Sequence, residues 1–157
     1  MLEMTVSIKK ILVPIDGSET SFKAANYAVN LAKMVAAELV PINIIEDVKQ
    51  GGAIGLQAKY GNMRIVEAFE RTRKTTAEEW LRKIENAAEK LGVKAKSAIL
   101  DSEGKNEKRL IIEYARKNGV DLIVIGSKGS SRFKGPWVGG FANSIIHQAT
   151  IPVLVVP

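Results

Sequence analysis

The sequence predicts a single α/β domain: a doubly wound, five-stranded, mostly parallel sheet with helices on both faces. Short runs of β-branched and aliphatic residues alternate along the chain with longer segments that have the apolar spacing of amphipathic helices. This β-α-β-α-β-α-β-α-β order requires crossover connections, which make the strands parallel and cover both faces of the sheet. The 157 residues suit one domain, and we expect residues 1–7 to form a tail before a domain over residues 8–157.

The first β-α-β unit is the clearest in the pattern. The apolar run 11–15 predicts a buried strand that closes in the turn Asp16-Gly17. Residues 21–36 carry alanine, leucine and valine at helical spacing, and residues 39–45 predict the second strand. Pro41 interrupts that strand, and because proline cannot donate to a ladder we expect this residue to lie at the periphery of the sheet.

The middle of the chain reads as a loop, a long helix and a strand. Residues 49–62 contain four glycines and no sustained period, which favours a loop. Residues 63–91 predict a helix with one apolar side, and Gly92 stands where a helix C-cap belongs. The alternating run 93–100 predicts a strand with one face in water.

The last third repeats the pattern twice. Residues 108–117 predict a helix, and the unbroken apolar run 122–125 predicts a strand buried on both faces. A glycine-rich stretch then leads to a helix over 139–148 and a final strand over 152–156. In open sheets of this kind ligands bind beyond the carboxyl ends of the strands, where the strand order reverses, so candidate residues are sought there.

Composition excludes several classes of site. The chain has no cysteine, which rules out disulfides, iron–sulfur clusters and thiol nucleophiles, and its one histidine rules out a multi-histidine metal site. His147 lies near the end of a helix with no Ser and carboxylate pair placed around it, which favours a surface or cap role. No stretch is long and apolar enough for a membrane span or a signal peptide, so we expect a soluble, cytoplasmic protein. The net charge is +6, and the basic residues are interspersed with acidic ones along the chain. This mixture is typical of a solvated surface, so nucleic-acid binding is not expected.

The segment 126–140 is the richest in chemistry. Glycines at a strand exit let the backbone approach a ligand closely, and Gly139-Gly140 falls at a helix start, where free N–H groups and the helix dipole attract anions. Lys128, Arg132 and Lys134 add positive charge, so the segment predicts a phosphate cradle. It matches neither the Walker A loop nor the dinucleotide fingerprint, and a plain glycine-rich turn is the alternative.

Two roles are open for Asp16 at the end of the first strand. It lies at the same predicted sheet edge, where its carboxylate could accept hydrogen bonds from a ribose. Asp16-Gly17-Ser18 is equally typical of a turn in which the Asp side chain bonds its own backbone.

Three motifs in order give the chain a resemblance to the universal stress protein family. They are residues 9–18 (KKILVPIDGS), the pattern Gly126-x2-Gly129-x9-Gly139, and residues 151–156 (IPVLVV). The resemblance spans nearly the whole chain and implies the Rossmann-like fold of the adenine nucleotide alpha hydrolases. It also implies a nucleotide-dependent regulator of the stress response that binds ATP, with Mg²⁺ or Mn²⁺ accompanying the phosphates.

By the same resemblance, the adenosine would lie against the ends of the first two strands and the triphosphate along the glycine motif. The implied nucleotide-binding residues are Pro14, Ile15, Asp16, Ile44, Gly126, Ser127, Lys128, Gly129, Ser130, Ser131, Arg132, Gly139, Gly140, Phe141 and Ala142.

The chain departs from the family pattern at two phosphate ligands. Gly140 and Ala142 stand where the ATP-binding branch has hydroxyl residues. Hydrogen bonds to charged groups contribute about 1.5 to 3 kcal/mol each, so their loss would weaken affinity from tenfold to more than a hundredfold. A second departure is the longer acidic loop 101–105, whose carboxylates could repel a phosphate or bind a divalent ion.

The resemblance also implies a homodimer, formed through the last strand. Its residues Val153, Leu154, Val155 and Val156 form a short apolar edge, and unpaired edges invite association. A stress or interaction protein of the same fold that has lost nucleotide binding is the second hypothesis. An enzyme of the related nucleotide-activating families is the third, although no residue is placed as a general base, so any hydrolysis should be slow. Phe133 and Trp137 either cover the ligand or pack on the neighbouring helix.

Overall fold

A computed structural model describes residues 4–128 and 138–157 of the chain. In that part, five strands form one parallel sheet in the order β3-β2-β1-β4-β5. The strands are β1 (Lys10–Pro14), β2 (Glu38–Ile45), β3 (Ala98–Asp101), β4 (Leu122–Gly126) and β5 (Val153–Val156). The predicted α/β fold with a doubly wound sheet is therefore confirmed.

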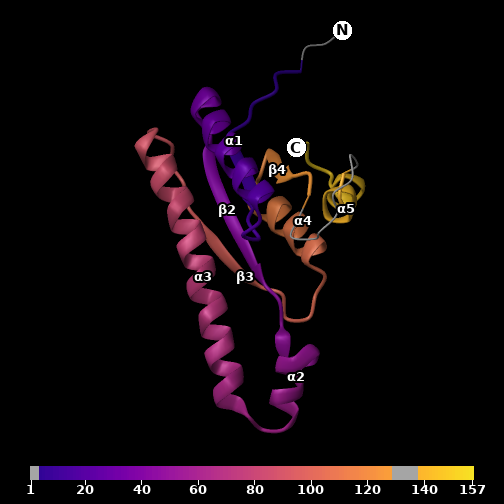
Figure 1. The fold of residues 1–157 in the computed structure, drawn as a ribbon. Coiled ribbons are helices and arrows are strands. Elements are labelled where there is room, and N and C mark those ends of the chain that lie inside the picture. Colours follow the sequence, from indigo (N-terminus) through magenta and orange to yellow (C-terminus); the bar gives the residue numbers. More distant parts are fainter. Residues whose placement is uncertain (1–3, 129–137) are drawn as a thin grey trace.

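Helices cover both faces of the sheet, as Figure 1 shows. Residues of α1 (Glu19–Val35) and α3 (Met63–Lys90) pack in one buried cluster with Ile11 and Val13 of β1. Residues of α4 (Glu107–Lys117) and α5 (Gly140–Gln148) pack in the other, with Leu12 of β1. Successive side chains of a strand point to opposite faces, so β1 belongs to both clusters. No helix in the described part of the chain could cross a membrane.

The predicted loop 49–62 is wrong in its middle, because that stretch holds a short 3₁₀ turn (Val48–Gln50) and the helix α2 (Gly52–Lys59). Gly55 is buried, and a Cβ there would lie 3.0 Å from the carbonyl oxygen of Lys49, so this glycine allows the turn to pack on the helix. The sequence pattern took Gly55 as a helix breaker, but in the structure it lies within a helix and allows close packing.

Two expectations about the second and third strands also need correction. β2 is an interior strand and Pro41 is fully buried in it, so the residue is not peripheral. Leu39 bonds to Lys94 and Lys96 on the β3 side, and by the two-residue alternation of a strand Pro41 faces that side too. There β3 has only an isolated bridge at Ala95 before its ladder begins at Ala98, later than the predicted residue 93. The missing N–H therefore falls in a gap of the ladder.

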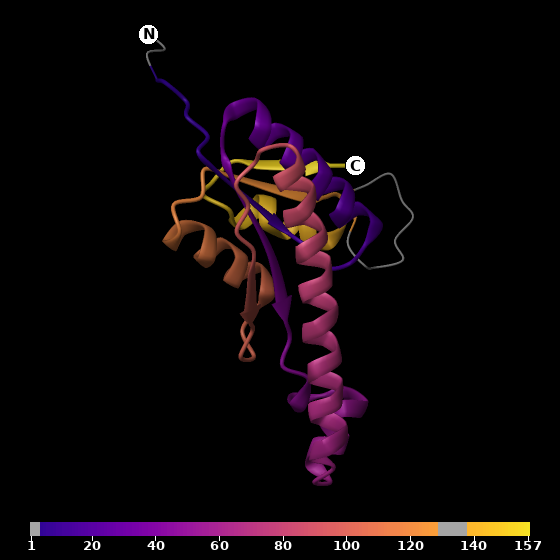
Figure 2. The same cartoon turned by 90° about the vertical axis from the view of Figure 1, so that its left-hand side faces the viewer.

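Figures 1 and 2 show that α2 and the first half of α3 reach beyond the end of the sheet as a helical hairpin. We call residues 51–72 the arm. The rest of α3 runs back along the sheet and packs on β2 and α1. At 28 residues, α3 is about 42 Å long, which is enough to serve both the sheet and the arm.

Candidate functional site

A cavity of about 670 Å³ opens at the carboxyl ends of the strands. Its walls include the ends of β1 and β4, the neighbouring strands between which the chain order of the sheet reverses. This is where open α/β sheets bind their ligands, and the volume suits a molecule the size of a nucleotide.

The turn after β1 forms one wall. Asp16 accepts a hydrogen bond at Oδ1 from the amide of Ser18 (2.9 Å), and Ser18 Oγ accepts one from the amide of Ser21 (3.1 Å), which caps α1. Gly17 has φ of +83°, and a Cβ on it would lie 2.3 Å from the indole of Trp80. Trp80 of α3 therefore lies directly on the turn, and Phe22 meets its ring edge-on with the ring centroids 6.4 Å apart.

Backbone and buried polar contacts hold the strand ends in place. The side-chain amide of Asn43 is buried and donates to the carbonyl of Ile15 (2.7 Å), which joins the ends of β2 and β1. Thr20 Oγ1 donates to the carbonyl of Lys128, which joins α1 to the segment after β4. Gly126 makes that approach possible, because a Cβ on it would lie 2.8 Å from the Thr20 backbone.

The start of α5 provides backbone donors. Gly139 is its N-cap and forms no side-chain capping bond, and its own amide donates to the carbonyl of Ser127 (2.7 Å). Because the first amides of a helix have no partner within the helix, those after Gly139 can bind an anion. Gly140 and Phe141 line the cavity, and a Cβ on Gly140 would meet no heavy atom within 4 Å.

Acidic and basic side chains line the same cavity. Asp16, Glu46 and Glu107 supply carboxylates, and Arg73, Lys108 and Lys128 supply cations. Burial raises the pKa of Glu107, and the charges of Glu46 and Asp16 raise it further, against a lowering by Lys108. The carboxylates repel a polyanion. A polyanion can therefore bind only near the backbone donors at the start of α5.

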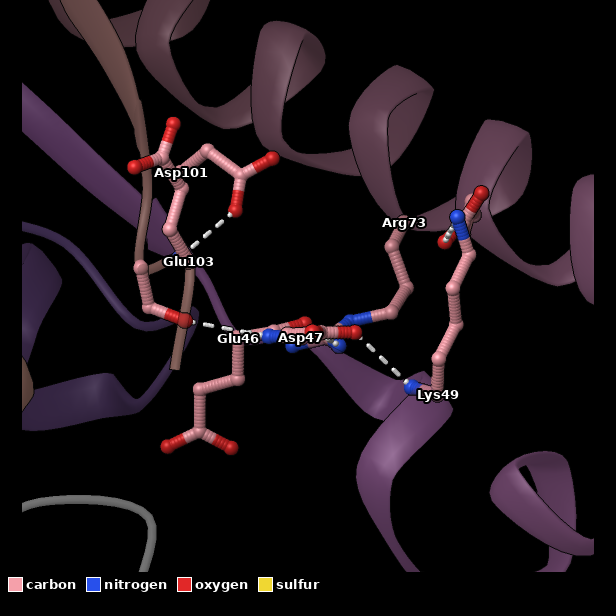
Figure 3. Close-up of polar contacts among 8 residues, drawn as sticks. Glu46, Asp47, Lys49, Arg73, Asp101 and Glu103 are labelled. Carbon is pink, nitrogen blue, oxygen red and sulfur yellow. Dashed lines mark hydrogen bonds and ion pairs between the residues drawn. The ribbon is translucent and has the colours of Figure 1, made fainter. Parts of the chain in front are cut away.

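Figure 3 shows polar contacts beyond the ends of β2 and β3, next to the cavity-lining residues Glu46 and Arg73. Arg73 Nη1 donates to the carbonyl of Glu46 (3.1 Å), and the amide of Asp47 donates to Ser102 Oγ (3.0 Å). Asp101 accepts from the amide of Glu103 (3.0 Å), so its carboxylate stabilises its own turn. Within the described ranges no group of three or more acidic or histidine side chains could hold a metal ion, and the loop 101–105 supplies no such group.

The structure brings together most of the described residues that the sequence proposed for the site. Eight of them line the cavity: Pro14, Ile15, Asp16, Ile44, Gly126, Lys128, Gly140 and Phe141. Ser127, Gly139 and Ala142 are buried beside it, and the Ala142 side chain packs in the cluster under α4 and α5. Gly129, Ser130, Ser131 and Arg132, with Phe133 and Trp137, lie outside the described residues. His147 is exposed on α5, as expected.

The α3 wall of the cavity was missed from the sequence. Thr72, Thr76 and Trp80 line it at intervals of four residues, together with Arg73. Threonine on the apolar side of a long amphipathic helix was the available signal, because residues four apart share a face. Glu107 and Lys108 line the cavity as well, and their places depended on loop lengths that the pattern did not give. Glu46, at the predicted end of the second strand, also lines it.

The chain matches proteins of known family over nearly its whole length. The model of the universal stress protein family matches residues 7–157. Universal stress protein MJ0531 of Methanocaldococcus jannaschii is 36% identical over 148 residues, which cover 94% of this chain and 81% of that protein.

Solved structures share the fold. UspA from Lactobacillus plantarum has a TM-score of 0.81 at 21% identity, covering 98% of this chain and 100% of that one. A universal stress protein from Archaeoglobus fulgidus in complex with dAMP has a TM-score of 0.63 at 18% identity, covering 98% and 100%. The structure of a universal stress protein in complex with cAMP has a TM-score of 0.64 at 20% identity, covering 96% of this chain and 97% of that one. The family model and the sequence relative together establish the resemblance seen in the three motifs: this chain belongs to the universal stress protein family.

Proposed function

We propose that this chain binds an adenine nucleotide, ATP, in the cavity at the ends of β1 and β4 and acts as a nucleotide-dependent regulator in the stress response. The observation that carries the proposal is the set of backbone donors at the start of α5, which open onto a cavity of nucleotide size. The dAMP and cAMP complexes of two structural neighbours support an adenine nucleotide as the ligand.

In this proposal the phosphates bind at the β4–α5 side of the cavity. Lys128 and the amides that follow Gly139 supply the positive potential there. The adenosine lies against Pro14, Ile15, Asp16 and Ile44, which also line the cavity. A divalent ion, Mg²⁺ or Mn²⁺, would come with the triphosphate and neutralise part of its charge. Residues 129–132 complete the phosphate side by resemblance alone.

The two positions at which the chain lacks the hydroxyl residues of the family differ in whether a side chain there can reach the cavity. Gly140 lines the cavity with open space beside its Cα, so a serine there has room to donate to a phosphate. Ala142 is 1% exposed within an apolar cluster, so a serine there would bury its hydroxyl away from the cavity, at a cost of about 1 to 3 kcal/mol. The hydroxyl missing at position 140 is therefore the one to restore.

Isothermal titration with ATP and Mg²⁺ tests the proposal. We expect binding by the natural chain and an affinity that is from about tenfold to more than about a hundredfold higher in Gly140→Ser, because a hydrogen bond to a charged group contributes about 1.5 to 3 kcal/mol. Ala142→Ser is the matched control and should leave affinity unchanged while lowering stability. Absence of heat at millimolar nucleotide in both the natural chain and Gly140→Ser would exclude a nucleotide function.

A specific observation favours the second hypothesis, an interaction protein without nucleotide. Three carboxylates line the cavity, and the hydroxyl ligand at position 140 is missing, both of which oppose phosphate binding. The same titration distinguishes the two: the second hypothesis requires that the natural chain bind no nucleotide.

We also propose that the chain forms a homodimer through β5. Among the residues that the structure describes, this strand pairs with β4 alone and lies at the edge of the sheet, and its Val153, Leu154 and Val155 are half-buried. A second copy of β5 would supply the missing backbone partners. Light scattering coupled to size-exclusion chromatography tests this, since a monomer at every concentration would exclude it.

A further inference from the structure

The side-chain amide of Asn43, near the end of β2, uses one of its two polar atoms within the described chain. Asn43 is 8% exposed, and its Nδ2 donates to the carbonyl of Ile15 at 2.7 Å. The orientation of the amide follows from its chemistry, because a carbonyl oxygen can only accept and the NH₂ group must therefore face it. The other polar atom, Oδ1, is an acceptor that remains for a different contact.

This Oδ1 atom opens onto the cavity. It has no hydrogen-bond partner among the described residues. In the same part of the chain no buried side-chain nitrogen or oxygen lacks a partner, so Oδ1 is not sealed inside the protein. Because Asn43 is more than nine-tenths buried and lines the cavity, the cavity is the space that reaches Oδ1. A ligand that brings no donor to a buried acceptor leaves it unpaired, which weakens binding.

The backbone of the next residue adds a donor. Ile15 donates to the carbonyl of Ile42 (2.8 Å), so alternate residues of β2, Ile44 included, direct their backbone groups toward β1. The next bond of a parallel ladder would run from the amide of Ile44 to the carbonyl of Ile15, and these two residues do not form it. The Asn43 side chain bonds to that carbonyl instead. Ile44 lines the cavity, so its N–H is available to a ligand.

A donor followed by an acceptor matches one edge of adenine. The ring nitrogen N1 of adenine accepts a hydrogen bond, and the exocyclic amine beside it donates. Hypoxanthine and guanine carry the reverse pair on that edge, because their N1 bears a hydrogen and an oxygen replaces the amine. The amide of Ile44 and Oδ1 of Asn43 therefore complement adenine and oppose the two oxygen-bearing purines.

We propose that Asn43 determines the base specificity of this cavity: Oδ1 accepts a hydrogen bond from the exocyclic amine of adenine, while Nδ2 holds the carbonyl of Ile15. The inference rests on the proposed function, in which the adenosine lies against the ends of β1 and β2. A base with an oxygen in place of the amine brings two acceptors together and leaves Oδ1 unpaired. The cavity therefore selects adenosine nucleotides over inosine and guanosine nucleotides.

Three nucleotides that differ at position 6 of the purine test this in the natural chain. They are ATP, which has the amine, purine riboside triphosphate, which has a hydrogen, and inosine triphosphate, which has an oxygen. In isothermal titration with Mg²⁺, purine riboside triphosphate should bind at least about tenfold more weakly than ATP, because Oδ1 loses its partner. Inosine triphosphate should bind more weakly still, because its oxygen repels Oδ1.

The same titrations distinguish a failure of this inference from a failure of the proposed function. Equal affinities for ATP and purine riboside triphosphate would overturn the specificity role of Asn43 and would leave nucleotide binding standing, with Oδ1 bonded to water or to a ribose hydroxyl. Absence of binding by all three nucleotides would overturn the proposed function and this inference with it. These measurements need no variant, so they decide the matter even where a substitution prevents folding.

Asn43→Leu separates specificity from structural support. The variant removes both halves of the amide, so the ratio of its affinities for ATP and purine riboside triphosphate should approach one. Ser102→Ala is the matched control, because Ser102 is also buried at a strand end, accepts from the amide of Asp47 (3.0 Å) and does not line the cavity. Ser102→Ala should keep the ratio of the natural chain. If Asn43→Leu lowered both affinities by the same factor, its amide would support the fold without reading the base.

Discussion

Adding one methyl group to either of two glycines of the family motif should change stability in opposite directions. In Gly126→Ala the new Cβ lies 2.8 Å from the carbonyl carbon and oxygen of Thr20, where ordinary contact begins at 3.4 Å. Backbone atoms cannot rotate away as a side chain can, so α1 and β4 must separate. Overpacking of this kind costs about 1 to 3 kcal/mol. In Gly140→Ala the Cβ meets nothing within 4 Å, and alanine in place of glycine in a helix stabilises by up to about 1 kcal/mol.

Thermal denaturation followed by circular dichroism measures both effects on the same scale. For a chain of 157 residues we expect the melting temperature of Gly126→Ala to fall by roughly 2 to 12 °C and that of Gly140→Ala to rise by roughly 1 to 4 °C. The two variants control for each other, since the chemical change is identical. If Gly126→Ala were neutral, the close approach of Thr20 to β4 would not constrain the fold, and some other cause would have to account for glycine at position 126.

The sequence predicted the elements that depend on local pattern. The core strands and the long helix were placed within one or two residues, because runs such as 11–15 and 122–125 are continuously apolar and α3 keeps one apolar side. α2 was missed because Gly55 lowers helix propensity. Glycine is required at this position because the carbonyl of Lys49 packs against it, which is a tertiary contact. Pro41 was misplaced for the same kind of reason, since the gap in the β3 ladder is set by the partner strand.

The candidate site was predicted where motif residues lie on the strand ends and missed where a distant helix supplies a wall. Asp16, Gly126 and Gly140 come together because parallel strands end at one edge of a sheet. Trp80 and Glu107 reach the same cavity from α3 and α4, and the crossing of a helix over a strand end cannot be read from spacing. Ala142 shows the reverse case, in which a residue of the motif has its side chain turned into the core.

Two further predictions concern side chains that the sequence did not identify. Trp80 lines the cavity, and it is the single tryptophan in a Trp137→Phe variant. The fluorescence of that variant should therefore change on titration with ATP and Mg²⁺. Constant emission at saturation would show that the ligand does not bind next to α3. Glu107 should make stability depend on pH. Its pKa is raised in the folded state above the ordinary value of 4.5, so the folded state binds more protons and stability falls as the pH rises from about 4.5 through the raised value. Glu107→Gln removes the charge and keeps the shape, so it should be more stable than the natural chain at neutral pH, and the difference should disappear below about pH 4.5, where the natural carboxyl is protonated in both states. Urea midpoints at several pH values measure this, and a difference that stayed constant or grew on acidification would show that burial and the charges of Glu46 and Asp16 do not act on this carboxyl.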